Sequence, residues 1–319
     1  MTATTVYDLP AARRTDFVRS ADGTRINVEE YGPEGAPTVV LIHGWTCKTA
    51  FWAPVIHELA GEFRVVAYDQ RGHGRSETPG RGGYSTEALA DDLAAVVDAF
   101  LGEDEQAVLV GHSMGGMTAM AAADRPAIQD RTAAVLLANT GSGRLLDMAN
   151  VLPPRVRSAR VRRAFQRFLL LSALPLGPQT ALTRAAFKYG VMAKSSTGEQ
   201  VAATARIVHA CARRPRSGWG RVLSELNLDA GIAALRAPTA VLVGTADKLT
   251  PPAHGPDMVT RLANCVGLTE LDGRGHMTPI EAPAAFAAVV RTLVRDHLTG
   301  KTAETAKTAA TAKAEETTA

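Results

Sequence analysis

The segment AVLVGHSMGGMTAMAAA, residues 107–123, constrains the fold of this chain more than any other part of the sequence. Its first four residues are apolar and predict a short buried strand, and its alanine-rich second half predicts a helix. The turn between them reads G-H-S-M-G at residues 111–115, which matches the G-x-S-x-G pattern of a nucleophile elbow. Gly111 and Gly115 carry no Cβ, so the strand and the helix can approach each other closely around a strained turn. The pattern therefore predicts that the Ser113 hydroxyl is exposed at the carboxyl end of a sheet, beside the amino end of a helix whose dipole favours negative charge.

Two later positions are candidates for the groups that a nucleophilic serine needs, a base that takes its proton and a third group that orients the base. The elbow geometry predicts the chain order Ser, Asp or Glu, and then His. The strand patterns T-A-V-L-V-G at 239–244 and V-G-L-T-E-L at 266–271 predict two further buried strands, followed by Asp247 and by a glycine-rich loop with His276. Catalytic groups gather at the carboxyl ends of strands in open α/β sheets. Asp247 or His276 alone would equally be an ordinary loop residue, but their joint order and placement predict that both belong to one site with Ser113.

The sequence resembles the α/β-hydrolase superfamily over residues 15–297. The resemblance rests on five blocks in a fixed order, which read H-G-W-T at 43–46, D-Q-R-G-H-G-R-S at 69–76, G-H-S-M-G at 111–115, G-T-A-D at 244–247 and G-H at 275–276. It implies a mostly parallel sheet covered by helices on both faces, with an inserted helical cap. It also implies Ser113 as nucleophile, His276 as general base and then acid, and Asp247 as the carboxylate that orients His276.

Members of this superfamily also place the acid at an alternative position after the preceding strand, which here is predicted at 133–138. That strand runs into N-T-G at 139–141, which contains no carboxylate, so Asp247 is favoured. An aspartate in place of Ser113 would have indicated an epoxide hydrolase or a dehalogenase, and the serine argues against both.

An acyl-transfer site also needs preorganised N–H donors for the oxyanion that develops in the transition state. One donor is predicted to be the backbone N–H of Met114, the residue after the nucleophile. The resemblance implies that the other is the backbone N–H of Trp45, in the loop after the apolar run 39–42. This loop departs from the H-G-G-G form, because a single glycine is followed by tryptophan. A tighter oxyanion hole is therefore expected, which disfavours esters of crowded tertiary alcohols.

Four residues near these loops are predicted to line the substrate pocket together with the Trp45 side chain: His43, Gly44, Cys47 and Met277. An alternative for Cys47 is a buried thiol without a role, and an alternative for His43 is a structural histidine. No metal or organic cofactor is expected, because the histidines include no H-E-x-x-H pair and the cysteines lack zinc-ligand spacing.

Strand patterns alternate with helix patterns through most of the chain, which predicts a mostly parallel α/β sheet with both faces covered. Residues 85–100 and 282–297 carry apolar side chains at helical spacing and are predicted to cover the sheet. The expected organisation is an N-terminal extension at 1–16, a core formed by 17–140 and 228–298, a helical cap at 141–227, and a disordered tail at 299–319. The tail has too little apolar area to offset the entropy of ordering it.

The predicted cap contains helix patterns at 154–174, 179–192, 198–212 and 220–227 and no convincing strand. Between Arg144 and Glu225 it carries 13 Arg and 2 Lys against three acids, whereas the whole chain has a net charge of +3. Three interpretations stay open: a solvated helix whose apolar stripe packs on the core, a cleft that attracts an anionic substrate, and a surface that contacts an anionic membrane. A nucleic-acid partner is not expected, because no stacking platform or binding motif accompanies the arginines.

The sequence also predicts the compartment. Residues 1–17 contain no apolar core of signal-peptide length, and no apolar run reaches transmembrane length. The three cysteines, Cys47, Cys211 and Cys265, are scattered and odd in number, so they form no disulfide framework. A cytoplasmic protein is therefore expected, and nothing in the sequence indicates its oligomeric state.

Together these features predict a serine hydrolase that cleaves an acyl bond of a small molecule, most simply a carboxylic ester, through an acyl-enzyme. Within the resemblance, the same three side chains also serve C–C bond hydrolases, thioesterases and haloperoxidase-like perhydrolases, and S-M-G-G at 113–116 does not discriminate among them. An acyltransferase and a ligand receptor without catalysis are further alternatives. The cap is expected to determine the substrate.

Overall fold

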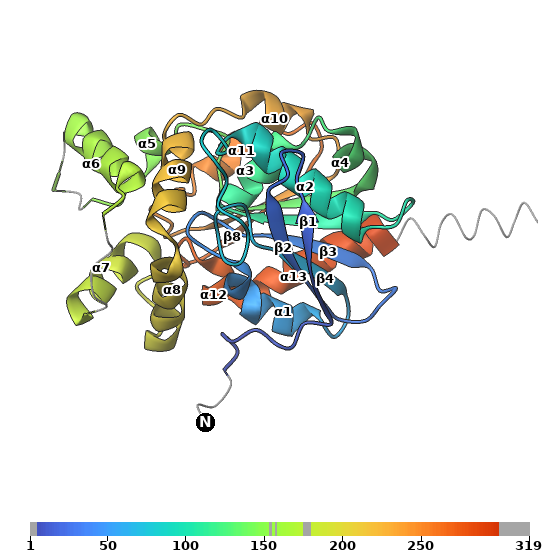
Figure 1. The fold of residues 1–319 in the computed structure, drawn as a ribbon. Helices are drawn as coiled ribbons and strands as arrows, with labels where there is room; N and C mark the ends of the chain where they lie inside the picture. Colours follow the sequence, from blue (N-terminus) through green and yellow to red (C-terminus); the bar gives the residue numbers. More distant parts are fainter. Residues whose placement is uncertain (1–4, 153–154, 157, 175–179, 300–319) are drawn as a thin grey trace, which may run out of the picture.

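The computed structural model describes residues 5–152, 155–156, 158–174 and 180–299. These residues form an eight-stranded sheet with the order β1-β2-β4-β3-β5-β6-β7-β8 (Figure 1). Strand β2 runs antiparallel to both of its neighbours and the remaining pairs are parallel, which confirms the predicted mostly parallel sheet. The strands are β1 (Arg14–Arg19), β2 (Arg25–Tyr31), β3 (Thr38–Ile42), β4 (Arg64–Tyr68), β5 (Ala107–His112), β6 (Thr132–Ala138), β7 (Thr239–Gly244) and β8 (Cys265–Leu271).

Helices join the strands and form the cap at one end of the molecule (Figure 1). The helices are α1 (Ala53–Leu59), α2 (Thr86–Phe100), α3 (Met114–Ala121), α4 (Pro126–Arg131), α5 (Leu145–Met148), α6 (Ala159–Leu171), α7 (Ala181–Val191), α8 (Gly198–Ala210), α9 (Arg213–Ser224), α10 (Asp229–Ala234), α11 (His254–Val259), α12 (Thr278–Glu281) and α13 (Pro283–Val294). A 3₁₀ helix η1 (Thr49–Trp52) precedes α1, and a π-helix η2 (Arg295–Thr299) follows α13.

Several boundaries differ from the sequence prediction. Strand β1 begins at Arg14, inside the segment expected as an extension. The sequence did not predict it because this edge strand buries only Val18 and therefore has no apolar run. Helix α9 begins at Arg213 rather than at 220, and α6 begins at Ala159 rather than at 154. The predicted disordered tail, beyond its first residue, lies outside the described residues.

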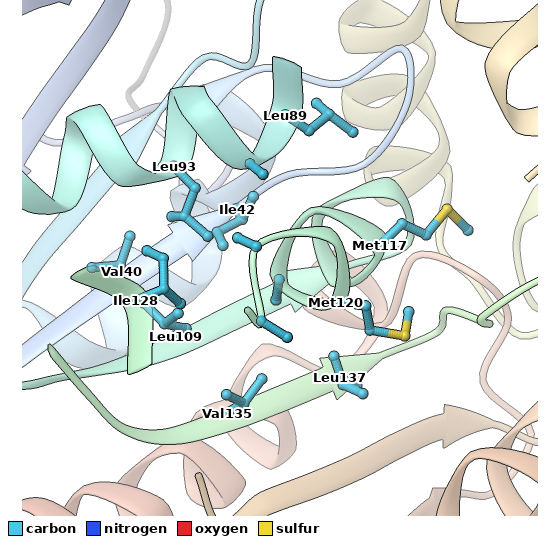
Figure 2. Packing of buried hydrophobic residues seen from close by; sticks show 14 of the residues in the cluster. Val40, Ile42, Leu89, Leu93, Leu109, Met117, Met120, Ile128, Val135 and Leu137 are labelled. Atoms are coloured by element: carbon cyan, nitrogen blue, oxygen red, sulfur yellow. The ribbon is translucent and has the colours of Figure 1, made fainter. Parts of the chain in front are cut away.

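The sheet has a buried core on each face. Alternate residues of a strand point to opposite faces, and Figure 2 shows Val40, Leu109 and Val135 on the face that α2 and α3 cover with Leu93 and Met120. The intervening side chains of the same strands pack on the other face against α1 and α13. This double cover explains why the central strands are apolar throughout, and it fixes the carboxyl ends of β3, β5, β7 and β8, from which the candidate site residues emerge.

Part of the block at 69–76 is a structural hub. The buried Asp69 carboxylate accepts the backbone N–H groups of Thr49 at 2.7 Å and Arg75 at 2.8 Å, and the Asn27 side-chain amide at 3.1 Å. Gly74 has φ +52°, and a Cβ there would overlap this carboxylate. The hub therefore joins β2, the loop after β4 and the segment before α1.

Arg71, in the same block, forms an ion pair inside the protein. Its Nη2 and Nε atoms donate to the two oxygens of Asp92 on α2 at 2.6 and 2.7 Å, and both side chains are about 1% exposed. A third contact joins Nη1 to Asp22 at 2.8 Å. Removing one member of such a pair leaves the other charge buried without compensation.

We expect Arg71→Ala to lower the free energy of unfolding by about 3–5 kcal/mol, because Asp92 then stays buried and unpaired. The matched control is Arg125→Ala, which breaks a pair with the neighbouring Asp91 whose members are 40% and 33% exposed. Exposed pairs contribute less than about 1 kcal/mol. Urea unfolding of both variants measures the difference, and equal losses would contradict the assignment of a buried, mutually dependent pair.

The predicted cap leaves and rejoins the core at one place. An isolated antiparallel bridge pairs Gly143 with Asn227, and the N–H of Leu228 donates to the carbonyl of Ser142 at 2.7 Å. Between these points α6 packs on α9, and α7 packs on α8. The cap is thus a helical unit inserted between β6 and β7, and the segments by which it leaves and rejoins the core lie side by side.

Candidate active site

Ser113 occupies a strained turn between β5 and α3. Its backbone angles are φ 52° and ψ −117°, and its N–H donates to the Ala138 carbonyl at 2.9 Å. A Cβ on Gly115 would overlap the backbone of Ile42, and one on Gly111 would overlap the first turn of α3. The two glycines of the G-x-S-x-G pattern are therefore required by close backbone approach, as predicted. Strain of this kind costs about 1–3 kcal/mol and is typical of functional sites.

Asp247 and His276, which lie far apart from Ser113 in the sequence, meet at the carboxyl ends of β7 and β8. The Nδ1 atom of His276 lies 2.8 Å from Oδ2 of Asp247, and both side chains are buried. Ser113 and His276 line the same cavity. The three predicted side chains are thus gathered at one edge of the sheet.

The Asp247 carboxylate is surrounded by donors. Its Oδ1 accepts the backbone N–H groups of Leu249 at 2.8 Å and Thr250 at 3.0 Å, and its Oδ2 accepts the side-chain amide of Asn139 at 2.9 Å. Burial raises the pKa of Asp247, but the nearby His276 and these hydrogen bonds outweigh burial, so the pKa lies below its ordinary value. The site therefore holds an ionised carboxylate against the imidazole.

Asn139 is a functional candidate whose role the sequence did not indicate. It follows β6 at the alternative position for the acid, has φ 46°, and donates to both Asp247 and the Gly275 carbonyl. The amide thus supports the carboxylate of the next strand instead of replacing it. The only sequence signal was a polar residue at the end of a predicted buried strand.

Two further side chains hold the loop that carries His276. The buried Glu281 carboxylate accepts the backbone N–H groups of Gly275 at 2.9 Å and Met277 at 3.1 Å, on either side of the histidine. The His112 Nε2 atom lies 2.7 Å from the His276 carbonyl, and burial lowers the pKa of His112 to about 3. A neutral His112 donates this bond, so the residue before the elbow serine also positions the loop of the imidazole.

The two predicted oxyanion donors have no protein acceptor. In the part of the chain that the structure describes, neither the backbone N–H of Trp45 nor that of Met114 makes a hydrogen bond. Met114 is the first residue of α3, where helical N–H groups lack intrahelical partners. A Cβ on Gly44 would lie 3.1 Å from Cβ of Ser113, so the loop after β3 packs directly on the elbow.

A cavity of about 500 Å³ lies between the cap and the core. Of the predicted pocket residues, Trp45, Cys47 and Met277 line it, together with Ser113 and His276. Burial raises the pKa of the Cys47 thiol, so this cysteine is a neutral part of the wall.

His43 and Gly44 are corrections to the predicted pocket, because neither lines the cavity. His43 is completely buried, its Nδ1 lies 2.8 Å from the Gly44 carbonyl, and its Nε2 accepts the backbone N–H of Gln70 at 3.0 Å. Burial and the neighbouring His73 lower the pKa of His43 well below its ordinary value. A neutral His43 therefore joins the loop after β3 to the block at 69–76. His43 is thus a structural histidine, the alternative to a pocket residue that the sequence left open.

Helix α6 does not fit the first interpretation of the basic cap, a solvated helix whose apolar stripe packs on the core. Its apolar residues Val161, Phe165 and Phe168 are 53%, 37% and 55% exposed, so the apolar stripe does not pack on the core. Instead α6 contacts α5 and α9.

None of the described helices is long and apolar enough to cross a membrane. Among the described residues, no three His, Cys, Asp or Glu side chains lie close enough together to hold a metal ion.

Comparison with known proteins supports the same fold. The model of the alpha/beta hydrolase family matches residues 39–289. A bifunctional esterase/perhydrolase of Acinetobacter calcoaceticus is 45% identical over 101 residues, which cover 31% of this chain and only 36% of that relative. A putative carbamate hydrolase of Variovorax paradoxus (strain S110) is 31% identical over 269 residues, which cover 82% of this chain and 92% of that relative.

A solved esterase structure from Rhodococcus sp. ECU1013 superimposes with a TM-score of 0.73 at 22% identity, covering 89% of this chain and 99% of the other. At this identity the similarity describes the fold. The family match covers most of the chain, from β3 into α13. The chain therefore belongs to the alpha/beta hydrolase family.

Proposed function

We propose that this hydrolase cleaves carboxylic esters through an acyl-enzyme on Ser113. His276 acts as general base and then as general acid, and Asp247 orients it. The backbone N–H groups of Trp45 and Met114 hold the oxyanion. No metal or organic cofactor takes part in this chemistry.

The proposed reaction has two halves. The Ser113 hydroxyl oxygen attacks the ester carbonyl while Nε2 of His276 takes its proton, and the oxyanion of the tetrahedral intermediate accepts the two N–H groups. The intermediate collapses as His276 returns the proton to the leaving alcohol. Water then attacks the acyl-enzyme by the same route, with His276 again moving the proton, and the carboxylic acid is released.

One observation carries this proposal: the strained elbow serine and His276, which is paired with the buried Asp247, line the same cavity. The pair fixes the proton on Nδ1, which leaves Nε2 as the lone-pair nitrogen. One candidate oxyanion donor, Met114, follows the elbow serine, the other, Trp45, lies in the loop that packs on the elbow, and neither N–H has an acceptor among the described residues. These are the parts that acyl transfer needs, a nucleophile, a base and an oxyanion hole.

A second candidate activity is perhydrolysis, favoured by the 45% identity over 101 residues to an esterase/perhydrolase. In that reaction hydrogen peroxide replaces water as the nucleophile on the acyl-enzyme, and a peracid is released. Cleavage of thioesters or C–C bonds and transfer to an alcohol are alternatives for which the described residues supply no separate support. Contact of the basic cap with a membrane stays a prediction.

The proposed function is tested with a fluorophosphonate probe and a panel of 4-nitrophenyl esters of increasing chain length. We expect covalent labelling of Ser113, located by mass spectrometry, and ester turnover that EDTA leaves unchanged. Hydrogen peroxide added with acetate tests peracid formation on the same preparation. Folded protein that binds the esters without turnover and resists the probe would contradict the proposal and indicate a receptor.

A further inference from the structure

Arg216 is the only permanently charged side chain among the described residues that line the cavity, and no Asp or Glu lines it. The residue lies on α9 in the cap and is 4% exposed. Most of the remaining lining is apolar, from residues such as Phe168, Leu223 and Met277. The cavity therefore joins a hydrocarbon-like wall to a single buried positive charge.

The guanidinium group of Arg216 is only partly satisfied. Its Nε donates to the Ser172 carbonyl at 3.4 Å and its Nη2 donates to the carbonyls of Ser172 and Leu174, after α6. Among the described residues, its Nη1 has no hydrogen-bond partner and no carboxylate pairs with the group. A buried cation without a counter-charge is costly. Burial lowers the pKa of Arg216, although a guanidinium stays protonated in proteins.

Two other polar groups of the cap line the cavity and lack partners. The Oε1 atom of Gln166 on α6 and the Nε2 atom of His209 on α8 are buried, and neither forms a hydrogen bond within the part of the chain that the structure describes. Gln166 is 5% exposed, and its Nε2 donates to the Ala149 carbonyl, which leaves the oxygen as an acceptor. Buried polar atoms are rarely left unpaired in folded proteins. These groups and the free guanidinium nitrogen thus point to a ligand with polar atoms on its cap side.

Arg216 is also linked to the candidate oxyanion hole. The indole Nε1 of Trp45 donates to the Arg216 carbonyl at 3.0 Å. The same tryptophan supplies one of the two proposed oxyanion donors through its backbone. The Arg216 backbone is therefore joined to the loop that carries one oxyanion donor, and its side chain lies in the same cavity as Ser113.

We propose that Arg216 is a specificity-determining residue that binds a carboxylate carried by the substrate, so that the preferred substrates are acyl esters with a second, anionic carboxylate. This inference rests on the proposed ester hydrolysis by Ser113. A guanidinium carries one positive charge and matches one carboxylate. The apolar wall suits a hydrocarbon chain between the carboxylate and the ester.

The test compares chain-matched substrates on the whole protein. The anionic members are the 4-nitrophenyl monoesters of glutarate and adipate, and the neutral members are 4-nitrophenyl pentanoate and hexanoate. For the wild type we expect kcat/KM to be at least about tenfold higher for the anionic esters. For Arg216→Met we expect this ratio to fall by about 10- to 100-fold, the value of one charge-assisted hydrogen bond.

The matched control is Arg213→Met, on the same helix, exposed and outside the cavity lining, which should leave the ratio unchanged. Arg216→Lys keeps the charge and should retain part of the preference. Arg216→Met could also disturb Trp45 and lower the activity toward every ester. Such a loss cancels, because the ratio of kcat/KM for anionic to neutral esters is measured on one preparation. If Arg216→Met does not fold, the wild-type ratio still decides the matter.

Equal kcat/KM for anionic and neutral esters in the wild type would overturn the inference, as would an unchanged ratio in folded Arg216→Met. Either result leaves the proposed function standing, because the neutral esters are still hydrolysed. Absence of turnover with every ester, by contrast, would overturn the proposed function itself.

Discussion

Replacing Ser113 by alanine is expected to lower kcat for ester hydrolysis by about 10⁴- to 10⁶-fold, because the covalent route disappears and only the oxyanion hole and substrate binding remain. The change removes one oxygen atom. The backbone at this position keeps its φ of 52°, and its N–H bond to Ala138 is unaffected by the side chain. Thermal stability should therefore stay close to that of the wild type.

Steady-state turnover of 4-nitrophenyl esters and pre-steady-state kinetics measure this loss. The wild type is expected to show a burst of nitrophenol if release of the acyl group is slow, and Ser113→Ala should show none. Ser224→Ala is the matched control, because its hydroxyl donates to the Arg221 carbonyl within α9 and has no other hydrogen bond among the described residues. Purified Ser113→Ala that keeps more than about 1% of wild-type turnover would refute the nucleophile, since such a loss is far smaller than acyl-enzyme chemistry requires.

Much of the core was predictable because each central strand is an uninterrupted apolar run. The run 239–244 corresponds to β7, and Ser85 caps α2 by accepting the N–H of Ala88. The edge strand β1 was less clear, since it has a single buried side chain. Burial on both faces produces a strong sequence signal, whereas one exposed face and an edge weaken it.

The start of α9 shows why the cap was harder to predict. Gly218 and Gly220 suggest an interruption of a helix, yet both lie inside α9. A Cβ on Gly220 would overlap the Leu170 carbonyl of α6, and one on Gly218 would lie 2.8 Å from the Tyr84 ring. These glycines are needed for close packing between elements distant in the sequence, which a local pattern does not reveal.

The candidate active site likewise contains residues that the sequence predicts and residues that it does not. Ser113, Asp247 and His276 were predictable because each follows a strand in a fixed order. Asn139 and Glu281 were not, because they act through backbone and side-chain partners that only the fold brings near. A buried carboxylate such as Glu281 also looks like an ordinary helix residue in the sequence, where it is the last residue of α12 and lies two residues before Pro283, which begins α13.

The surroundings of Asp247 make asparagine a poor substitute despite its equal size. Oδ1 accepts two backbone N–H groups, from Leu249 and Thr250, and Oδ2 faces Nδ1 of His276 and the amide of Asn139. An asparagine would keep its oxygen toward the two N–H groups and turn its NH₂ group toward the imidazole. His276 would then carry its proton on Nε2, where it cannot accept the proton of Ser113.

Asp247→Asn is therefore expected to lower kcat by about 10⁴-fold with little change in KM, since the wrong tautomer removes general-base catalysis and leaves substrate binding intact. The matched control is Asp272→Asn, an exposed carboxylate at the end of β8 whose contact is with the Thr245 hydroxyl at 3.1 Å. NMR of labelled histidine provides a second readout, because the His276 proton should move from Nδ1 to Nε2 in Asp247→Asn. A loss below about tenfold with an unchanged tautomer would show that Asp247 does not orient His276, and the carboxylate would then have only a structural role beside Asn139.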